Sequence, residues 1–152
     1  MHDAVVSVDD DGVALAGGGL AACAEDWLRL AVLQLDGTWD GERVLPEGWT
    51  QAASAPAYPF TAPGRLPSTI TAHAGFGRHW WPLSADGGRV TADGSRGQLG
   101  YLDRDLGVAV LKTSLWPYDD PWVDRAQRDL SYLGLPDVAT AAQAPDTTEV
   151  NP

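Results

Sequence analysis

Apolar residues recur at three- and four-residue steps between positions 20 and 35, which predicts an amphipathic helix. The apolar positions are Leu20, Cys23, Trp27, Leu28, Ala31, Val32 and Leu35. Glu25 and Asp26 lie in an early turn, where acidic side chains favour the start of a helix, and Gly37 follows its end. We expect this helix to pack on a sheet.

The middle of the chain predicts that sheet. Segments 76–83, 98–103 and 106–113 have the composition of strands, and the connection between the last two is too short for a parallel crossover. They are therefore expected to form an antiparallel three-strand meander. The nearly continuous apolar run 106–111 is typical of a central strand.

Shorter elements are predicted on either side of the first helix. Two strand-like stretches at 5–8 and 13–16 flank an acidic turn. Pro46 is expected to begin a short helix that ends near Ala53, because proline is accepted at the first helical position. The segment 54–72 is rich in proline, serine, threonine and alanine and reads as a surface loop.

A last helix is predicted to begin at Pro121. Its expected apolar face contains Trp122, Val123, Ala126, Leu130 and Leu133. Residues 136–152 contain few large apolar groups and are predicted to be a disordered tail. Residues 1–135 are thus expected to form one unit of the α+β class, with an antiparallel sheet flanked by helices.

Composition narrows the functional classes. The chain has 152 residues, 44% of them hydrophobic, and a formal net charge of −11. Ten basic residues among 21 acidic ones argue against nucleic acid and anionic membrane surfaces as partners. The single cysteine excludes an internal disulfide, and the first residues show neither the basic nor the apolar region of a leader, so a cytoplasmic location is expected.

Three familiar motifs are incomplete. Residues 17–22 fit a dinucleotide-binding G-x-G-x-x-A pattern, but the short antiparallel connections later in the chain argue against that fold. Ser95 lacks the first glycine of a nucleophile elbow, and no histidine follows it. His73 and His79 have no nearby third ligand, so they are more typical of core or pocket lining than of a zinc site.

Several longer blocks resemble the penicillin-recognising serine hydrolases, the superfamily of serine β-lactamases, and in particular the 6-aminohexanoate-dimer hydrolase and esterase branch. The most specific block runs from Arg96-Gly97-Gln98 to Trp116-Pro117. The others are His2-Asp3-Ala4 through Asp9, Gly17-Gly18-Gly19-Leu20 with its helix, Val44-Leu45-Pro46-Glu47-Gly48-Trp49, and His79-Trp80-Trp81. The resemblance implies that residues 1–135 are the C-terminal portion of a partial β-lactamase-like fold.

The resemblance also implies a site. Ala92, Asp93 and Gly94 take the place of the K-T-G element, and the residue after the glycine, Ser95, supplies a backbone N–H to the oxyanion hole. Trp81 is expected either to line the acyl pocket or to pack in the core. Arg96 is close enough to supply the charge that Ala92 lacks. No cofactor and no metal are implied, and the substrate would be a small ester or amide.

The family's nucleophile is missing. Lys112 is the only lysine and no serine stands three residues before it, and the only asparagine is Asn151, so neither S-x-x-K nor Y-x-N occurs. The first hypothesis is therefore a hydrolase fragment whose serine, lysine and tyrosine lie upstream, with Met1 an internal or misassigned start, a gene break or one half of a split enzyme. The alternative is a degenerate, non-catalytic fragment that binds or dimerises through an exposed sheet edge. Either hypothesis predicts association with the missing N-terminal half or self-association.

Overall fold

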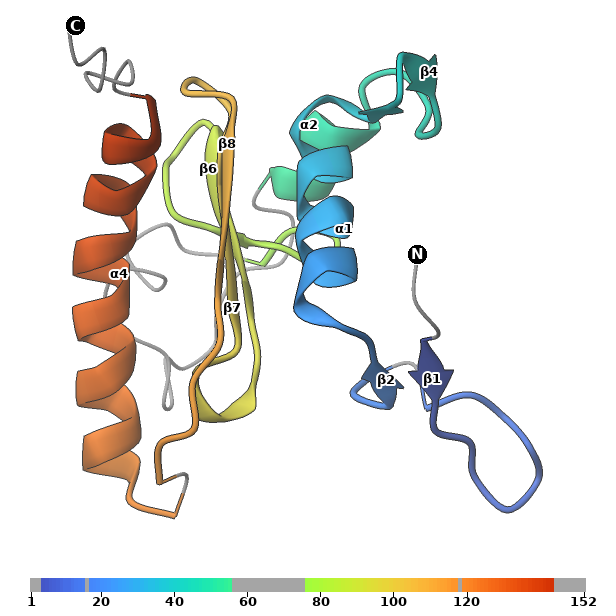
Figure 1. The fold of residues 1–152 in the computed structure, drawn as a ribbon, viewed down its shortest axis with the longest axis vertical. Helices are drawn as coiled ribbons and strands as arrows, with labels where there is room; N and C mark the ends of the chain where they lie inside the picture. The colour runs from blue at the N-terminus through green and yellow to red at the C-terminus, as the bar shows by residue number, and fades with distance from the viewer. Residues whose placement is uncertain (1–3, 16, 56–75, 118, 144–152) are drawn as a thin grey trace, which may run out of the picture.

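The chain folds into three layers, with one sheet between two long helices (Figure 1). A computed structural model describes residues 4–15, 17–55, 76–117 and 119–143. The elements in chain order are β1 (Val5–Val6), β2 (Leu20–Ala21), α1 (Ala24–Asp36), β3 (Thr38–Trp39), β4 (Glu42–Arg43), α2 (Trp49–Ser54), β5 (Trp81–Pro82), β6 (Arg89–Asp93), the 3-10 turn η1 (Ser95–Gly97), β7 (Leu99–Asp103), β8 (Val108–Lys112) and α4 (Pro121–Gln143).

The sheet has four strands in the order β5-β6-β7-β8, and every neighbouring pair is antiparallel. The α+β class and the antiparallel meander are confirmed, but the meander contains one strand more than the sequence predicted. The additional strand, β6, alternates polar and apolar side chains and gave no distinct apolar run. The predicted strand 76–83 is limited to Trp81–Pro82.

Strand β8 lies at the edge of the sheet, although its apolar run predicted a central position. Its side chains are apolar on both faces because a helix covers each face. Val108 and Val110 pack on the α4 side, and Ala109 packs on the α1 side. Burial of both faces, rather than a strand on each side, therefore explains the run.

Helix α4 begins at Pro121 as predicted but turns a different face to the sheet. The buried residues are Asp124, Arg128, Ser131, Tyr132, Leu135 and Ala139. Trp122, Leu130 and Leu133 are 81%, 62% and 71% exposed, so the predicted apolar face points away from the sheet. The polar residues on the buried face are accommodated by partners on neighbouring elements, which sequence periodicity does not reveal.

The same helix continues through Pro136 to Gln143, beyond the start of the predicted disordered tail. The prediction is therefore wrong for residues 136–143, where Ala139 is buried against the sheet. Residues 144–152 lie outside the described part of the chain, as does most of the predicted loop 54–72.

The elements of the N-terminal segment also differ from those predicted. Leu20 and Ala21 form strand β2, which pairs with β1, and helix α1 begins only at Ala24. The predicted strand 13–16 is reduced to an isolated bridge between Val8 and Ala14. Among the described residues, none of the helices combines the length and apolar character that crossing a bilayer requires.

Candidate functional site

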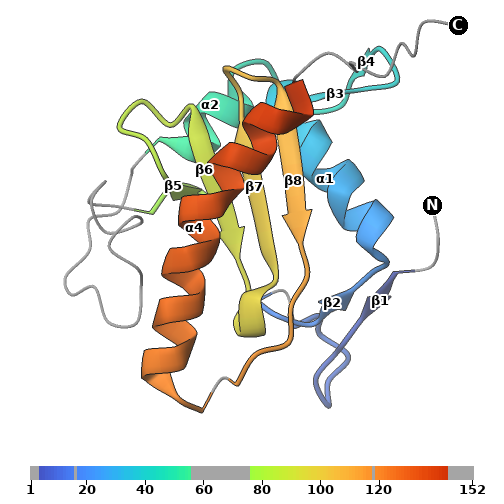
Figure 2. The ribbon, with the colours of Figure 1, turned by 60° about the vertical axis from the view of Figure 1, so that its left-hand side comes forward.

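The predicted oxyanion residues lie in the connection between β6 and β7, which we call the 94–98 turn (Gly94, Ser95, Arg96, Gly97 and Gln98). It lies at the end of the sheet near the N-terminus of α4 (Figure 2). The Gly94 N–H donates a 2.7 Å hydrogen bond to the Gln98 carbonyl, which closes the turn. Arg96 and Gly97 both have left-handed backbone conformations, with φ values of 61° and 85°.

Ser95 is an exposed residue at the start of this turn. Gly94 before it is extended, with φ −106° and ψ 164°. Within the described residues, the Ser95 N–H donates no hydrogen bond. Such a donor is chemically suited to an incoming anionic oxygen, because it belongs to the backbone and has no partner among the described residues to give up.

Trp116 supports the other end of the turn. Its ring lies so close to the Gly97 Cα that a Cβ at Gly97 would overlap it. Trp116 is buried, and its indole Nε1–H donates a 2.8 Å hydrogen bond to Asp124 at the start of α4. Glycine at position 97 is thus required both by the positive φ and by this packing.

A buried group of charges lies below the turn. Arg128 of α4 forms ion pairs with Asp93, at the end of β6, and with Asp124, whose Oδ2 lies 3.1 Å from the Arg128 Nε. The side chains of all three residues are less than one-tenth exposed. The Arg128 guanidinium also lies 3.4 Å from the Gly94 carbonyl oxygen, and burial lowers its pKa.

Tyr132 completes this group one helical turn further along α4. Its hydroxyl donates a 2.6 Å hydrogen bond to the second oxygen of Asp93 and lies 3.3 Å from the Thr91 hydroxyl. Burial raises the pKa of Tyr132 to about 12, while Thr91 and Arg128 act in the opposite direction. Asp93 is therefore held through both carboxylate oxygens.

Lys112 lies at the same end of the sheet, because the register of β8 places it opposite Leu99 at the start of β7. Its ammonium contacts the Ser114 hydroxyl and lies 4.6 Å from the centre of the Trp116 ring. Burial lowers the pKa of Lys112. The Gln98 side chain donates to the Ser114 carbonyl, which ties the turn to the segment that follows β8.

The other predicted site residues have different surroundings. Arg96 is exposed at the tip of the turn. Trp81 pairs with Thr91 in the sheet, packs against the core on the α4 side, and lies 4.2 Å from Phe76 between ring centres. Trp81 therefore has the contacts of a core residue, which is one of the two roles expected for it, the other being a place in the acyl pocket.

Sequence reasoning missed Arg128, Asp124 and Trp116 as neighbours of the turn. Asp124 and Arg128 are four positions apart on one helix, the spacing of an ion pair, but nothing in the sequence shows that this face meets the sheet. The signal that the sequence offers is this four-residue spacing of opposite charges.

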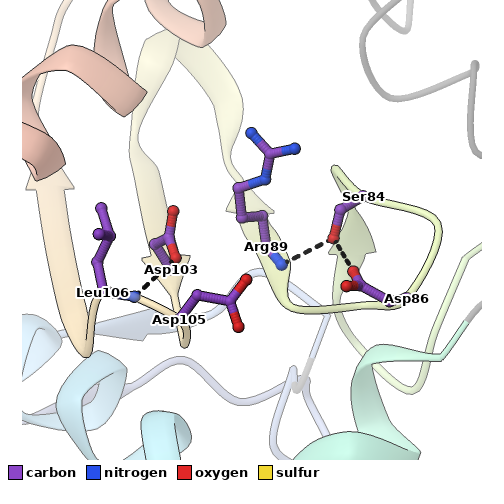
Figure 3. A pocket seen from close by; sticks show the side chains of 6 residues that line it. All are labelled: Ser84, Asp86, Arg89, Asp103, Asp105 and Leu106. Carbon is purple, nitrogen blue, oxygen red and sulfur yellow. Dashed lines mark hydrogen bonds between the residues drawn. The ribbon is translucent and has the colours of Figure 1, made fainter.

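A hollow of about 280 Å³ lies at the opposite end of β6 and β7 (Figure 3). It is lined by Ser84, Asp86, Arg89, Asp103, Asp105 and Leu106. Three of the lining side chains form hydrogen bonds within the lining: the Ser84 hydroxyl donates to Asp86, and Asp103 accepts from the Leu106 backbone N–H. In the described ranges no three histidine, cysteine or acidic side chains are grouped so as to hold a metal ion. His79 is exposed, and His73 lies outside those ranges.

Comparison with known proteins shows a distant relationship to a hydrolase. The 6-aminohexanoate-dimer hydrolase of Paenarthrobacter ureafaciens is 29% identical over 120 residues, which is 78% of this chain and 31% of that protein. The chain therefore spans about a third of the length of this curated relative. No family model matches the chain. The chain is a partial, distant relative of a hydrolase, and its fold is compatible with part of a β-lactamase-like domain.

Proposed function

We propose that this chain is the C-terminal part of a β-lactamase-related serine hydrolase that acts on small esters or amides through an acyl-enzyme. In this proposal the 94–98 turn supplies one donor of the oxyanion hole and the neighbouring surface forms a wall of the acyl pocket. The observation that carries the proposal is the Ser95 N–H, which has no partner among the described residues and stands in a turn fixed from both ends. The relationship to 6-aminohexanoate-dimer hydrolase supports it.

The chain's own residues have a limited role in this reaction. A serine outside the chain would attack the substrate carbonyl, and the Ser95 N–H would donate to the oxygen on which negative charge develops. One donor of this kind contributes about 3 kcal/mol to the transition state. The Ser95 hydroxyl takes no part, and Arg96 would attract a carboxylate or another anionic group of the substrate.

The test is hydrolysis of p-nitrophenyl acetate and nitrocefin by the 152-residue chain, alone and mixed with the remaining part of the Paenarthrobacter hydrolase. We expect activity only in the mixture. Activity of the chain alone would contradict the placement of the nucleophile and would bring Ser95 back as a candidate.

Two substitutions of Ser95 separate the backbone from the side chain. Ser95→Ala keeps the N–H and should leave activity in the mixture nearly unchanged. Ser95→Pro removes the N–H and is compatible with the extended Gly94 before it, so it should lower kcat by about 10²–10³-fold without unfolding the chain. Loss of activity in the alanine variant would instead indicate that the hydroxyl reacts.

A non-catalytic binding or dimerisation module is the second candidate function. Strand β8 lies at the edge of the sheet, which favours pairing with another strand, and α4 carries an exposed apolar face. Under this alternative no mixture is active, and the purified chain still associates.

A further inference from the structure

The contacts below the 94–98 turn form a closed ring that joins both of its ends to helix α4. Arg128 reaches Asp93 and the Gly94 carbonyl at the start of the turn. It also binds Asp124, which holds Trp116 against Gly97 near the end of the turn. We propose that Arg128 is a positioning residue that holds the 94–98 turn in the conformation in which Ser95 presents its N–H. The effect of Arg128 on catalysis rests on the proposed function, whereas its effect on the conformation of the turn does not.

The turn requires an external restraint of this kind. Arg96 has a left-handed backbone with φ 61° although it carries a side chain, and this conformation is unfavourable for residues other than glycine. Within the turn, the hydrogen bond from Gly94 to Gln98 closes the loop but does not fix Ser95 between them. Contacts from α4 at both ends supply the missing restraint.

Arginine has the geometry that this position needs. Its planar guanidinium carries five N–H donors, so one side chain serves two carboxylates and a carbonyl oxygen at once. Two buried carboxylates facing one cation leave an excess of acceptors, and the Tyr132 hydroxyl satisfies one of them by donating to Asp93. A lysine in the same place would keep the charge, but its single ammonium could not reach all three groups.

The test compares Arg128→Lys with Arg125→Lys in the full chain. Arg125 lies on the same helix, is exposed, and faces Asp129 at 4.0 Å, so its substitution makes the same chemical change without touching the turn. Because the Trp116 ring lies against Gly97, the Gly97 α-protons should be shifted upfield in the NMR spectrum. In Arg128→Lys we expect this shift to collapse and the ¹⁵N heteronuclear NOE of residues 94–98 to fall. Residues of β8 and α1 should be unaffected, and Arg125→Lys should resemble the parent.

A milder variant covers the case in which Arg128→Lys does not fold. Trp116→Phe removes the donor to Asp124 together with the part of the indole ring that lies against Gly97. We expect it to increase the mobility of residues 94–98 as well, with the far-UV circular dichroism unchanged. An unaltered turn in whichever of these variants folds, or a loosening spread evenly over the chain, would overturn the proposal.

The catalytic consequence is measured in the mixture with the rest of the Paenarthrobacter hydrolase. Arg128→Lys should lower kcat at least about tenfold with little change in KM, since a misplacement of about one ångström costs on the order of 10²-fold in rate. A mobile turn with unchanged kcat would overturn the positioning role. If no mixture is active, the proposed function fails, while the NMR comparison still decides whether Arg128 holds the turn.

Discussion

Gly97 is the residue at which the turn tolerates least change. An alanine there would have to adopt φ 85° and would place its methyl group in the Trp116 ring. We expect Gly97→Ala to lower the free energy of unfolding by about 3 kcal/mol, from backbone strain and overpacking together. Urea unfolding followed by tryptophan fluorescence measures this loss.

Gly107 provides the matched control. It has φ 66°, but nothing lies within 4 Å of a Cβ built on it. Gly107→Ala should therefore cost only the strain, about 1 kcal/mol. Equal losses at the two positions would show that Trp116 moves aside and does not restrain the turn.

The buried Tyr132 hydroxyl predicts a loss of stability in alkali. Its pKa rises to about 12 in the folded chain from an ordinary value near 10, so the unfolded state loses this proton first. Stability from this group is complete below pH 10 and falls as the pH rises toward 12. Asp93, Arg128 and Thr91 face the hydroxyl, and the first of these accepts its proton in a hydrogen bond.

Tyr132→Phe isolates the contribution of this hydroxyl. The variant should lose some stability at pH 8, because one oxygen of Asp93 loses its donor, but its stability should fall less steeply between pH 10 and pH 11. Urea unfolding at a series of pH values gives both slopes. Identical slopes in parent and variant would assign the alkaline loss to other groups, among them Tyr101, whose pKa is also raised to about 12 by burial.

At the scale of elements, Pro136 is the least favourable residue within α4. Proline has no N–H to donate to the carbonyl four residues earlier, and its ring crowds that carbonyl. Pro136→Ala should therefore stabilise the chain by about 2 kcal/mol. Pro121→Ala, at the first position of the same helix, should change stability by less than about 0.5 kcal/mol, because proline is well accepted there. Thermal unfolding of the two variants distinguishes the positions.

The elements that the sequence predicted well are those with local signals. Helix α1 and the start of α4 follow from periodicity and from Pro121, and the β7–β8 hairpin follows from two apolar runs with a short turn between them. Strand β6 was not recognised as a separate strand, because its polar residues Thr91 and Asp93 are buried by partners on α4. Burial of this kind depends on tertiary packing, which local patterns do not encode.

The candidate site likewise contains one part that the sequence could predict and another that it could not. The position of the 94–98 turn could be predicted because glycines punctuate it, and the resemblance drew attention to Ser95. The contact of Arg128 with the turn spans 34 residues and joins a helix to a loop, so no spacing rule predicts it. The orientation of α4 was mispredicted for the same reason, since its outward face is the more apolar one.

At the scale of the whole molecule, the outward face of α4 predicts self-association. Leu130 and Leu133 are mostly exposed and lie about one helical turn apart on the surface of α4. Exposed apolar groups of this size favour association. We expect the purified chain to be larger than a monomer by light scattering and to bind a dye specific for apolar surfaces.

Charges placed on that face should reverse the association. Leu130→Glu with Leu133→Glu should shift the chain toward the monomer without loss of helix content. The control is Gln127→Glu with Ala142→Glu, which adds the same charge to other exposed positions of the helix. A parent chain that is already monomeric, or an equal effect of both pairs, would contradict a role for this face.

The ring below the turn has a consequence for synthesis on the ribosome. The turn is synthesised before Trp116, Asp124 and Arg128, so the growing chain contains Ser95 before any of these residues can hold it. Domains tend to fold as units once their last elements are available. The Ser95 donor should therefore acquire its orientation only when α4 docks, and a nascent chain that ends before Arg128 would carry every residue of the turn without its geometry.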